Sequence, residues 1–245
     1  MLIALMSDIH ANREAFSACL AHAAAAGVDR YVFLGDYVGY GADPAWAVDT
    51  VADYVGRGAN ALLGNHDEAI SATRVDMNEA ALAAIEWTRN QLDSRQRGFL
   101  GGLPLALEEA DRLYVHASAD APAAWRYVTD AEEAGHSLAA TTCRLTFCGH
   151  VHVPALFRLE ADELEALAPI AGVGIALLAR RRWLAVIGAV GQPRDGVPDA
   201  CYALLETQTS TLTYARVPYD IARAAAKIRS AGLPPILAAR LEYGY

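Results

Sequence analysis

The first half of the chain alternates between short apolar runs and longer segments with helical spacing of apolar residues. The runs Leu2–Met6 and 31–34 are typical of buried strands. The segment from Asn12 to the glycine stop at Gly27, and the one that opens at Pro44 and runs to about residue 55, are typical of amphipathic helices. A third apolar run follows at 59–63. This order predicts parallel strands joined by crossover helices.

The second half changes from long helical segments to short strands. Helical spacing covers about 65–91 and 129–139, and apolar runs at 105–107, 113–116 and Leu145–Cys148 predict strands between and after them. After Pro154, six short apolar runs are separated by turns: 155–159, 164–168, 175–179, 183–187, 201–205 and 212–217. Helices are predicted at 221–229 and 236–241. The pattern predicts one domain over residues 1–245, with a meander added to a parallel first half.

Composition favours a small substrate over a polymer. With 245 residues, 54% of them hydrophobic, the chain can bury a large core without disulfides. The formal net charge is −9, and the sequence has no long run of Lys and Arg. Proteins that bind extended nucleic acid through many phosphates normally carry a basic face. We therefore expect no extended nucleic-acid surface.

The cysteines and the apolar segments indicate a cytoplasmic protein. Four cysteines are dispersed in apolar segments without a CxxC pair, which favours free buried thiols over a disulfide or a zinc cluster. The apolar start lacks the basic and small-residue features of a signal peptide and fits a first strand. No apolar run approaches the roughly 20 residues of a membrane span. We expect no contact with a membrane.

Candidate ligands for metal ions follow the predicted strands. They occur in SDIH, GDYVGYG, GNHD, YVH and GHVH, and they are Asp8, His10, Asp36, Asn65, His66, His116, His150 and His152. Open α/β sheets build their sites where strands end. Side chains two apart on a strand share a face, so Asp8 with His10, and His150 with His152, are each expected to offer two ligands. Oxygen and imidazole ligands without thiolate suit Mn, Fe or Zn.

Each of these motifs alone has a simpler interpretation. A strand-end histidine is usually a hydrogen-bonded structural residue, and NHD is usually a turn or a helix cap. Five such groups in this order, each after a strand, are poorly explained by chance. His22 and His136 lie in helical segments and are interpreted as ordinary.

Several neighbouring residues have two open interpretations. Asn12 either contacts phosphate or caps the helix that follows it, with the cap favoured. Arg194 in GQPRDG either clamps phosphate or belongs to a turn, and Gln192 of the same stretch is a further candidate for substrate contact. Asp67 either orients His66 or caps the next helix, with the cap favoured. Tyr37 and Tyr40 either line the pocket or pack beneath the loop.

The motifs SDIHAN, GDYVGYG, GNHD, VH and GHVHVP, in this order, resemble the signature blocks of the calcineurin-like metallophosphoesterase superfamily. GYGADP, GQPRDG and the C-terminal VPYDIARAAAKIRSAGLP resemble its small bacterial and archaeal phosphodiesterase branch, so the resemblance covers nearly the whole chain. It implies an α/β (α+β) fold: a four-layer αββα sandwich of two mixed β-sheets flanked by helices, with the site at one edge. Two departures are Ala117, where the family often has glycine, and Ala189, where relatives often have serine.

The resemblance also implies a binuclear metal site. Asp8, His10 and His152 would bind one ion; Asn65, His116 and His150 would bind the other; and Asp36 would bridge both. The two divalent or trivalent ions would be manganese first, with Fe, Zn, Ni or Mg as alternatives, and would share a bridging hydroxide that attacks phosphorus. His66 would serve as the general acid for the leaving oxygen.

The implied activity is hydrolysis of a small phosphoester, and of phosphodiesters rather than phosphoproteins. The superfamily's protein phosphatases carry DRG where this chain has GYG, so an arginine clamp for phosphate is missing. Two alternatives stay open: a catalytically idle binding scaffold on the same fold, and a pyrophosphatase acting on dinucleoside polyphosphates. Substrate choice would depend on the loops 38–45 and 118–129, which carry no recognisable motif.

Overall fold

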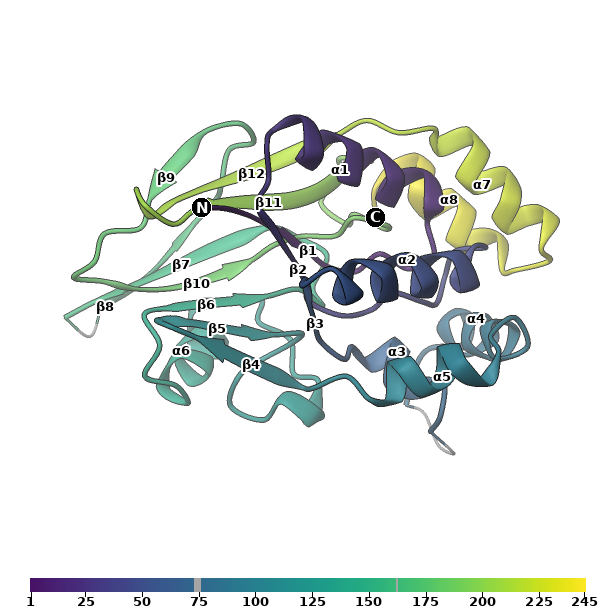
Figure 1. Cartoon of the computed structure of the whole chain (residues 1–245), viewed down its shortest axis with the longest axis horizontal. Coiled ribbons are helices and arrows are strands. Elements are labelled where there is room, and N and C mark those ends of the chain that lie inside the picture. The colour runs from purple at the N-terminus through teal and green to yellow at the C-terminus, as the bar shows by residue number, and fades with distance from the viewer. Residues whose placement is uncertain (73–75, 162) are drawn as a thin grey trace.

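Two mixed six-stranded sheets pack face to face in the computed structural model, which describes residues 1–72, 76–161 and 163–245 (Figure 1). The first sheet has the order β3 (Asn60–Ala61), β2 (Arg30–Phe33), β1 (Leu2–Met6), β11 (Ala200–Glu206), β12 (Thr211–Val217), β9 (Gly174–Ala176). The second has the order β4 (Ala106–Glu109), β5 (Arg112–Val115), β6 (Leu145–Cys148), β10 (Arg182–Val186), β7 (Ala155–Glu160), β8 (Glu163–Leu167). The expected fold class is confirmed.

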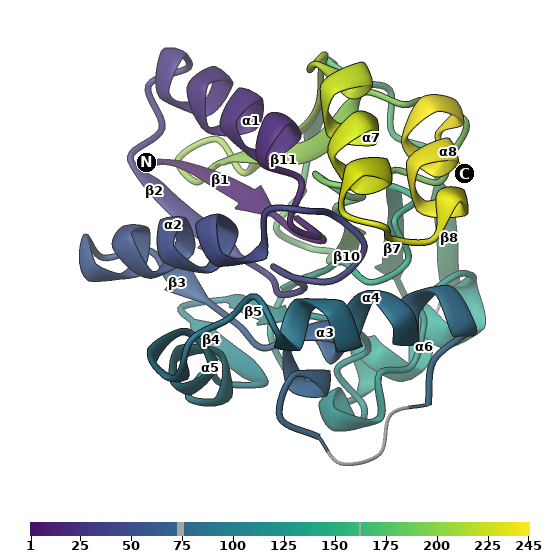
Figure 2. The ribbon, with the colours of Figure 1, turned by 90° about the vertical axis from the view of Figure 1, so that its right-hand side faces the viewer.

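Helices cover the outer faces and one end of this sandwich. They are α1 (Arg13–Ala25), α2 (Pro44–Gly56), α3 (Asn65–Ala69), α4 (Glu79–Arg89), α5 (Ser94–Gly101), α6 (Ala131–Ala139), α7 (Ile221–Ser230) and α8 (Pro235–Tyr243), with a 3-10 turn at Pro122–Ala124. Helices α1 and α2 pack on the first sheet, and α6 packs on the second. Helices α4, α7 and α8 share a separate apolar cluster that includes Tyr40, at the end of the sandwich seen in Figure 2.

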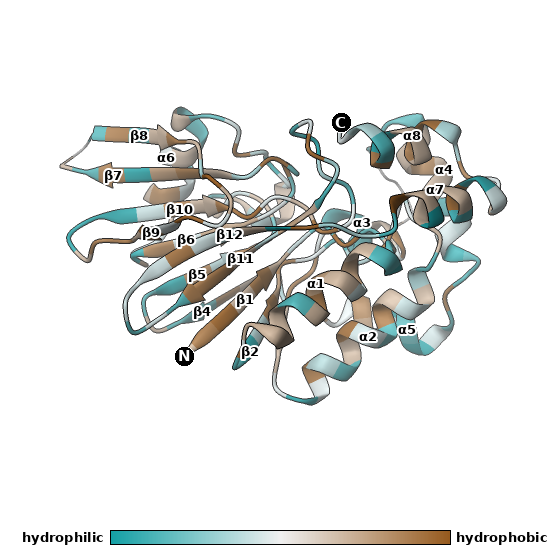
Figure 3. Ribbon diagram, turned by 90° about the horizontal axis from the view of Figure 1, so that it is seen from above, coloured by the Kyte–Doolittle hydropathy of each residue, from teal (hydrophilic) through white to brown (hydrophobic). Residues whose placement is uncertain are grey.

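Alternation along the strands explains the layers. In β1, Ile3 and Leu5 pack between the sheets, whereas Ala4 and Met6 pack against the outer helices. Both sets are fully buried because both faces of the strand are covered. Figure 3 shows the result: β1 is hydrophobic along its length, and the outer helices alternate between hydrophobic and hydrophilic residues.

The parallel strands determine where the site lies. Strands β1, β2 and β3 are parallel neighbours in the first sheet, and β5, β6 and β10 are parallel neighbours in the second. The segments after these strands contact one another across the sheets, since His150 N donates to Asp8 Oδ2 at 3.0 Å and Nδ1 of His116 lies 2.9 Å from Leu34 O. The strand ends of both sheets thus meet at one edge of the sandwich.

Some predicted elements were wrong. The continuous helix over 65–91 is two helices, α3 and α4, and the second has its own cap, because the side chain of Asn78 accepts from Ala81 N; residues 73–75 of that prediction lie outside the described ranges. Helix α5 was missed, although Asp93 and Gln96 form a capping box at its start. The strand predicted at 59–63 spans only Asn60–Ala61. The meander is divided between both sheets, because β10 pairs with β6 in parallel and β11 joins β1.

Two further observations concern the cysteines and the helices. All four cysteines are buried free thiols, as expected. Within the described ranges, no helix combines the length and the apolar character needed to cross a bilayer.

Candidate metal centre

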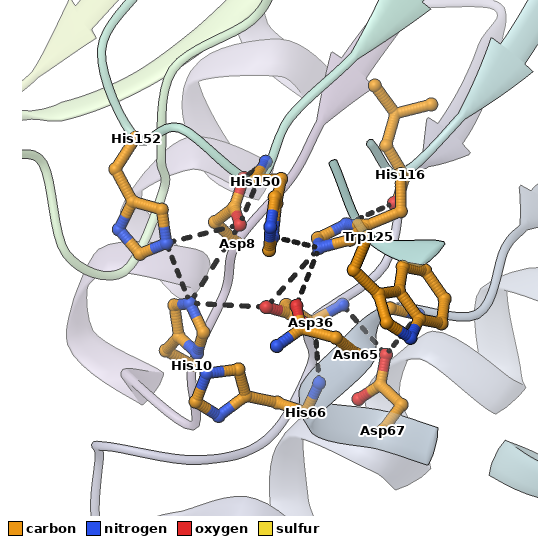
Figure 4. A network of polar contacts seen from close by, with 12 residues as sticks. Asp8, His10, Asp36, Asn65, His66, Asp67, His116, Trp125, His150 and His152 are labelled. Atoms are coloured by element: carbon orange, nitrogen blue, oxygen red, sulfur yellow. Dashed lines mark hydrogen bonds and ion pairs between the residues drawn. The ribbon is translucent and has the colours of Figure 1, made fainter. Parts of the chain in front are cut away.

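All eight candidate residues lie in segments that follow parallel strands, and the structure brings them together (Figure 4). The strand-based explanation of their spacing was wrong. Asp8, His10, Asp36, His150 and His152 are beyond the strand ends, and each has a positive φ, between 48° and 67°. These left-handed turns, not the period of a pleated strand, aim the side chains inward.

The first group consists of Asp8, His10 and His152. The Nε2 atoms of the two histidines are 3.0 Å apart, and Nε2 of His152 lies 3.2 Å from Oδ1 of Asp8. The same carboxylate oxygen lies 3.9 Å from Nε2 of His10. All three side chains are buried.

The second group consists of Asn65, His116 and His150. Nε2 of His116 lies 3.2 Å from Oδ1 of Asn65 and 3.2 Å from Nδ1 of His150. Both rings are buried, and Asn65 begins α3. His150 and His152 therefore face different groups, although only one residue separates them.

Asp36 lies between the two groups. Its Oδ2 is 3.7 Å from Nε2 of His10 and 3.4 Å from Nε2 of His116. Its other oxygen accepts a hydrogen bond from the backbone N–H of His66 at 2.9 Å. A carboxylate in this position can contact a cation in each group.

Backbone carbonyls orient three of the rings. Nδ1 of His10 lies 3.0 Å from Val38 O, Nδ1 of His116 lies 2.9 Å from Leu34 O, and Nδ1 of His152 lies 2.6 Å from Gln192 O. A carbonyl only accepts, so each Nδ1 carries a proton and donates it; in the neutral ring Nε2 then keeps its lone pair, and this atom faces the centre. Metal-binding histidines are fixed in this way by partners outside the site.

Burial and charge decide the protonation of these groups. Burial, followed by the neighbouring His116, lowers the pKa of His150 to about 3, and burial followed by His152 holds the pKa of His10 well below its usual value. For His116, burial lowers the pKa, but the charge and hydrogen bond of Asp36, together with the charges of Asp8 and Asp67, raise it to about 9. A divalent cation between His116 and Asp36 would take the place of that proton.

The donor atoms of the two groups fit two cations. Nε2 of His10 and Nε2 of His152 are both acceptors, and two acceptors 3.0 Å apart repel each other unless a cation lies between them. Carboxylate, amide and imidazole donors without thiolate are suited to Mn, Fe or Zn. The donor set of both groups therefore fits the metals that the sequence implied.

Two glycines permit the close packing around these ligands. A Cβ on Gly64 would overlap Oδ1 and the backbone nitrogen of Asp36, and a Cβ on Gly149 would overlap Asp8 and the hydroxyl of Ser7. Both glycines belong to motifs quoted above, GNHD and GHVH. They are required for space rather than for their backbone angles.

His66 lies at the edge of the first group. Its ring centroid is 4.8 Å from that of His10 and 4.5 Å from that of Tyr40, and its Nδ1 is buried without a hydrogen-bond partner among the residues that the structure describes. Burial lowers its pKa to about 4, although Asp36 acts in the opposite direction. A neutral ring still has one N–H to donate to a substrate oxygen.

The structure decides several open interpretations. Asn12 caps α1, because its Oδ1 accepts from Ala15 N at 3.1 Å, and its amide donates to Gly191 O at 2.8 Å. Tyr37 packs beneath the loop, with its hydroxyl donating to Leu62 O at 2.6 Å, whereas Tyr40 contacts His10 and His66.

Asp67 has a role that the sequence interpretation missed. The favoured cap is confirmed, because Asp67 takes part in a capping box at the start of α3, but this cap is only a part of its role. Its carboxylate accepts from the backbone N–H groups of Asp36 at 2.7 Å and Tyr37 at 2.9 Å, and also from Gly64 at 3.1 Å at the start of its own helix. It therefore fixes the loop that carries Asp36.

Arg194 and Gln192 lie beside the first group. The Arg194 guanidinium stands 5.6 Å from the centroid of Tyr40, and its Nη2 donates to Oε1 of Gln192 at 3.0 Å. Gln192 is fully buried, and its backbone carbonyl holds His152. Both residues border the site, and Arg194 is partly exposed there.

Two aromatic residues near the centre were not predicted. Tyr127 stacks on His150, with ring centroids 4.1 Å apart and 24° between planes. Trp125 meets the edge of His116 at 5.7 Å, and its indole N–H donates to Glu68 at 2.8 Å. Both lie in the loop 118–129, which was expected to influence substrate choice, and only their aromatic character could have singled them out.

Residues 1–210 match the calcineurin-like phosphoesterase superfamily domain. The chain belongs to this superfamily. It is also 33% identical over 254 aligned positions to an uncharacterised protein of Methanocaldococcus jannaschii, with 99% of this chain and 98% of the relative covered. The sequence resemblance is thereby confirmed.

Two solved structures resemble this chain over its whole length. A metallophosphoesterase from Sphaerobacter thermophilus superposes with a TM-score of 0.89 at 37% identity, with 100% of this chain and 99% of that chain covered. A hypothetical protein from Pyrococcus horikoshii has a TM-score of 0.79 at 17% identity, with coverage of 100% and 98%. The second likeness concerns the fold alone.

Proposed function

We propose that the protein hydrolyses phosphodiesters at a site that holds two divalent metal ions. The observation that carries this proposal is the pair of imidazole lone pairs that face each other at 3.0 Å between His10 and His152, with Asp36 extending toward the second group. Membership of a phosphoesterase superfamily supplies the reaction class. The donor set of the two groups supports the assignment of the metals to this site.

Each of the two ligand groups is expected to hold one cation. Asp8, His10 and His152 would hold one cation, Asn65, His116 and His150 the other, and Asp36 would contact both. When bound, such a pair supplies positive charge to the phosphoryl oxygens and lowers the pKa of a water for in-line attack on phosphorus. Asn65 contributes a neutral oxygen, which limits the negative charge around the substrate.

We assign His66 the role of assisting the leaving oxygen. Its backbone N–H is held by Asp36 at 2.9 Å, and its ring faces the first group rather than the core. Donation of an imidazole N–H to the departing oxygen stabilises the charge that develops there. The negative charge of a bound phosphoester would raise the pKa of this ring above its value of about 4.

The charges around the site favour a diester over a monoester. A diester carries one negative charge at neutral pH, whereas a monoester approaches two and needs more cationic partners. Arg194 is the basic side chain that stands over Tyr40. Gly39 occupies the loop where the superfamily's protein phosphatases have their arginine motif, and a side chain there would overlap Nδ1 of His66. The singly charged diester therefore fits better.

A pair of substrates with one leaving group tests this proposal. Protein loaded with Mn²⁺ is expected to hydrolyse bis(4-nitrophenyl) phosphate with a higher kcat/KM than 4-nitrophenyl phosphate. Asp36→Asn should lower kcat/KM by about a hundred- to a thousandfold, whereas Asp53→Asn, an exposed carboxylate on α2, should leave it unaltered. Inactivity toward diesters, monoesters and dinucleoside polyphosphates with two metals bound would contradict the proposal and favour a binding scaffold.

A further inference from the structure

A cleft of ≈ 280 Å³ opens beside the second ligand group. Asn65 and His150 belong to its lining, so the cleft is continuous with the candidate metal centre. Its size is near the lower end of the range of about 300–1,000 Å³ for small-molecule pockets. It has room for one ring system attached to the reacting phosphate.

Two aromatic side chains form one wall of this cleft. Tyr127 is 50% exposed although it stacks on buried His150, so one face of its ring is covered and the other is free. Trp125 is fixed by its indole hydrogen bond to Glu68 and by a left-handed backbone angle, φ = 52°. Figure 4 shows Trp125 beside His116 and Asn65. Rigid aromatic faces of this kind bind planar rings by stacking.

Two carboxylates occupy the described part of the lining. Glu68 and Asp76 are both exposed in the cleft. The basic residue between the two aromatic positions, Arg126, is engaged by Asp120. These two carboxylates would repel a substituent with further phosphate groups, whereas they would not repel a neutral ring.

We propose that this cleft binds a planar aromatic group of the phosphodiester, either an aryl ring or a nucleobase, with Tyr127 and Trp125 as the residues that determine specificity. The inference rests on the proposed function, since the ring is an ester substituent of the substrate cleaved at the neighbouring centre. It adds the substrate class: esters with one uncharged planar group, rather than alkyl diesters or polyphosphates.

Three diesters with the same 4-nitrophenolate leaving group test the inference. Their second ester group is 4-nitrophenyl, thymidine 5′-yl or ethyl. Wild-type protein should show a KM about tenfold lower for the aryl or nucleoside ester than for the ethyl ester. A preference for the nucleoside ester identifies a nucleobase as the natural ring, and equal preference for both identifies any planar ring. Equal KM values for all three would overturn the inference.

Variants of the aromatic wall supply the control. Tyr127→Leu should abolish most of the tenfold KM preference, and Tyr127→Phe should retain it because the ring is preserved. Tyr243→Leu removes an exposed aromatic side chain on α8, outside the cleft, and should retain the preference. If Tyr127→Leu raised KM equally for all three esters, the residue would act only through His150, and the inference would fail.

Binding without turnover separates this inference from the proposed function. Calorimetric titration of Mn²⁺-loaded protein with thymidine 5′-monophosphate and with inorganic phosphate gives two affinities. Tyr127→Leu should weaken the nucleotide about tenfold more than it weakens phosphate. Absence of hydrolysis for every ester would count against the proposed function, whereas equal weakening of both ligands would count against the ring site.

The acidic wall gives a second variant. Glu68→Gln keeps an oxygen for the indole N–H of Trp125 and removes the charge. The affinity for thymidine 5′-diphosphate should rise about fivefold relative to that for the monophosphate. No change in this ratio would show that the carboxylate does not exclude further phosphate groups.

Discussion

Each histidine of the first ligand group is oriented by the nitrogen that faces away from the centre. Val38 O and Gln192 O accept from Nδ1 of His10 and His152, so the tautomer of both rings is fixed by the backbone. Two glycines of the motifs leave space for the ligand carboxylates. A Cβ on Gly64 would overlap Asp36, and a Cβ on Gly149 would overlap Asp8. The short motifs thus specify ring orientation and clearance as well as ligand identity.

Gly39→Ala should lower activity because the new methyl group would overlap Nδ1 of His66 and would have to occupy φ = 83°. We expect kcat to fall at least about tenfold, since small displacements of reacting groups are costly, while the bound metals are retained. Steady-state kinetics and metal analysis measure both. Gly58→Ala has a similar backbone angle but open surroundings, and should cost stability without loss of kcat. Equal kinetic effects in both variants would contradict a specific role for this contact.

His66→Ala should separate the leaving-group role from metal binding. General acid assistance contributes roughly a hundred- to ten-thousandfold. The loss in kcat should be largest for an alkoxide leaving group and smallest for 4-nitrophenolate, which needs little protonation. Metal content should stay at the wild-type value. A loss that is independent of the leaving group would exclude the general acid assignment.

Connecting segments, rather than strands, form this site. The candidate ligands follow β1, β2, β3, β5 and β6, and left-handed turns aim five of them, namely Asp8, His10, Asp36, His150 and His152. Most strands were predictable because their residues are apolar on both faces, as in Leu2–Met6 and Leu145–Cys148, which match the structure. The turn geometry was not predictable, because two ligands separated by one residue give the same sequence pattern in a pleated strand and in a left-handed turn. The break between α3 and α4 was also hidden, since both helices have apolar residues at helical spacing.

Asp67→Asn should destabilise the loop after β2. Both carboxylate oxygens accept backbone N–H groups, so an amide would turn its own NH₂ toward one of them. We expect the free energy of unfolding to fall by about 2–3 kcal/mol, measured by urea denaturation. Asp93→Asn is the control, because asparagine caps a helix about as well as aspartate and should change stability by less than about 0.5 kcal/mol. Similar losses of stability in the two variants would argue against the role of Asp67 in fixing this loop.

The whole sandwich contributes to one centre. Asp8, Asp36 and Asn65 come from the first sheet, whereas His116, His150 and His152 come from the second. A metal ion bound by residues from both sheets would therefore connect the two sheets. The motifs singled out the residues that gather here, and the family resemblance implied their roles, but their convergence depends on the packing of two sheets, which local patterns do not encode.

Chelation should lower the thermal stability of the whole protein. Ligands that bind only the folded state add about 3–4 kcal/mol at a hundred to a thousand times their Kd, which corresponds to about 5–15 °C in Tm for a chain of this size. Calorimetry before and after EDTA treatment, and after return of Mn²⁺, measures this shift. Asp36→Asn should show a smaller shift. A Tm that is insensitive to chelation would contradict the connection between the sheets.

The most direct measurement is an anomalous-scattering crystal structure of the Mn²⁺-loaded protein. We expect two manganese peaks roughly 3.5–4 Å apart, one among Asp8, His10 and His152, the other among Asn65, His116 and His150. A carboxylate oxygen of Asp36 should contact each ion. A single peak, peaks elsewhere in the molecule, or an Asp36 that reaches only one ion would contradict the binuclear centre and the chemistry proposed for it.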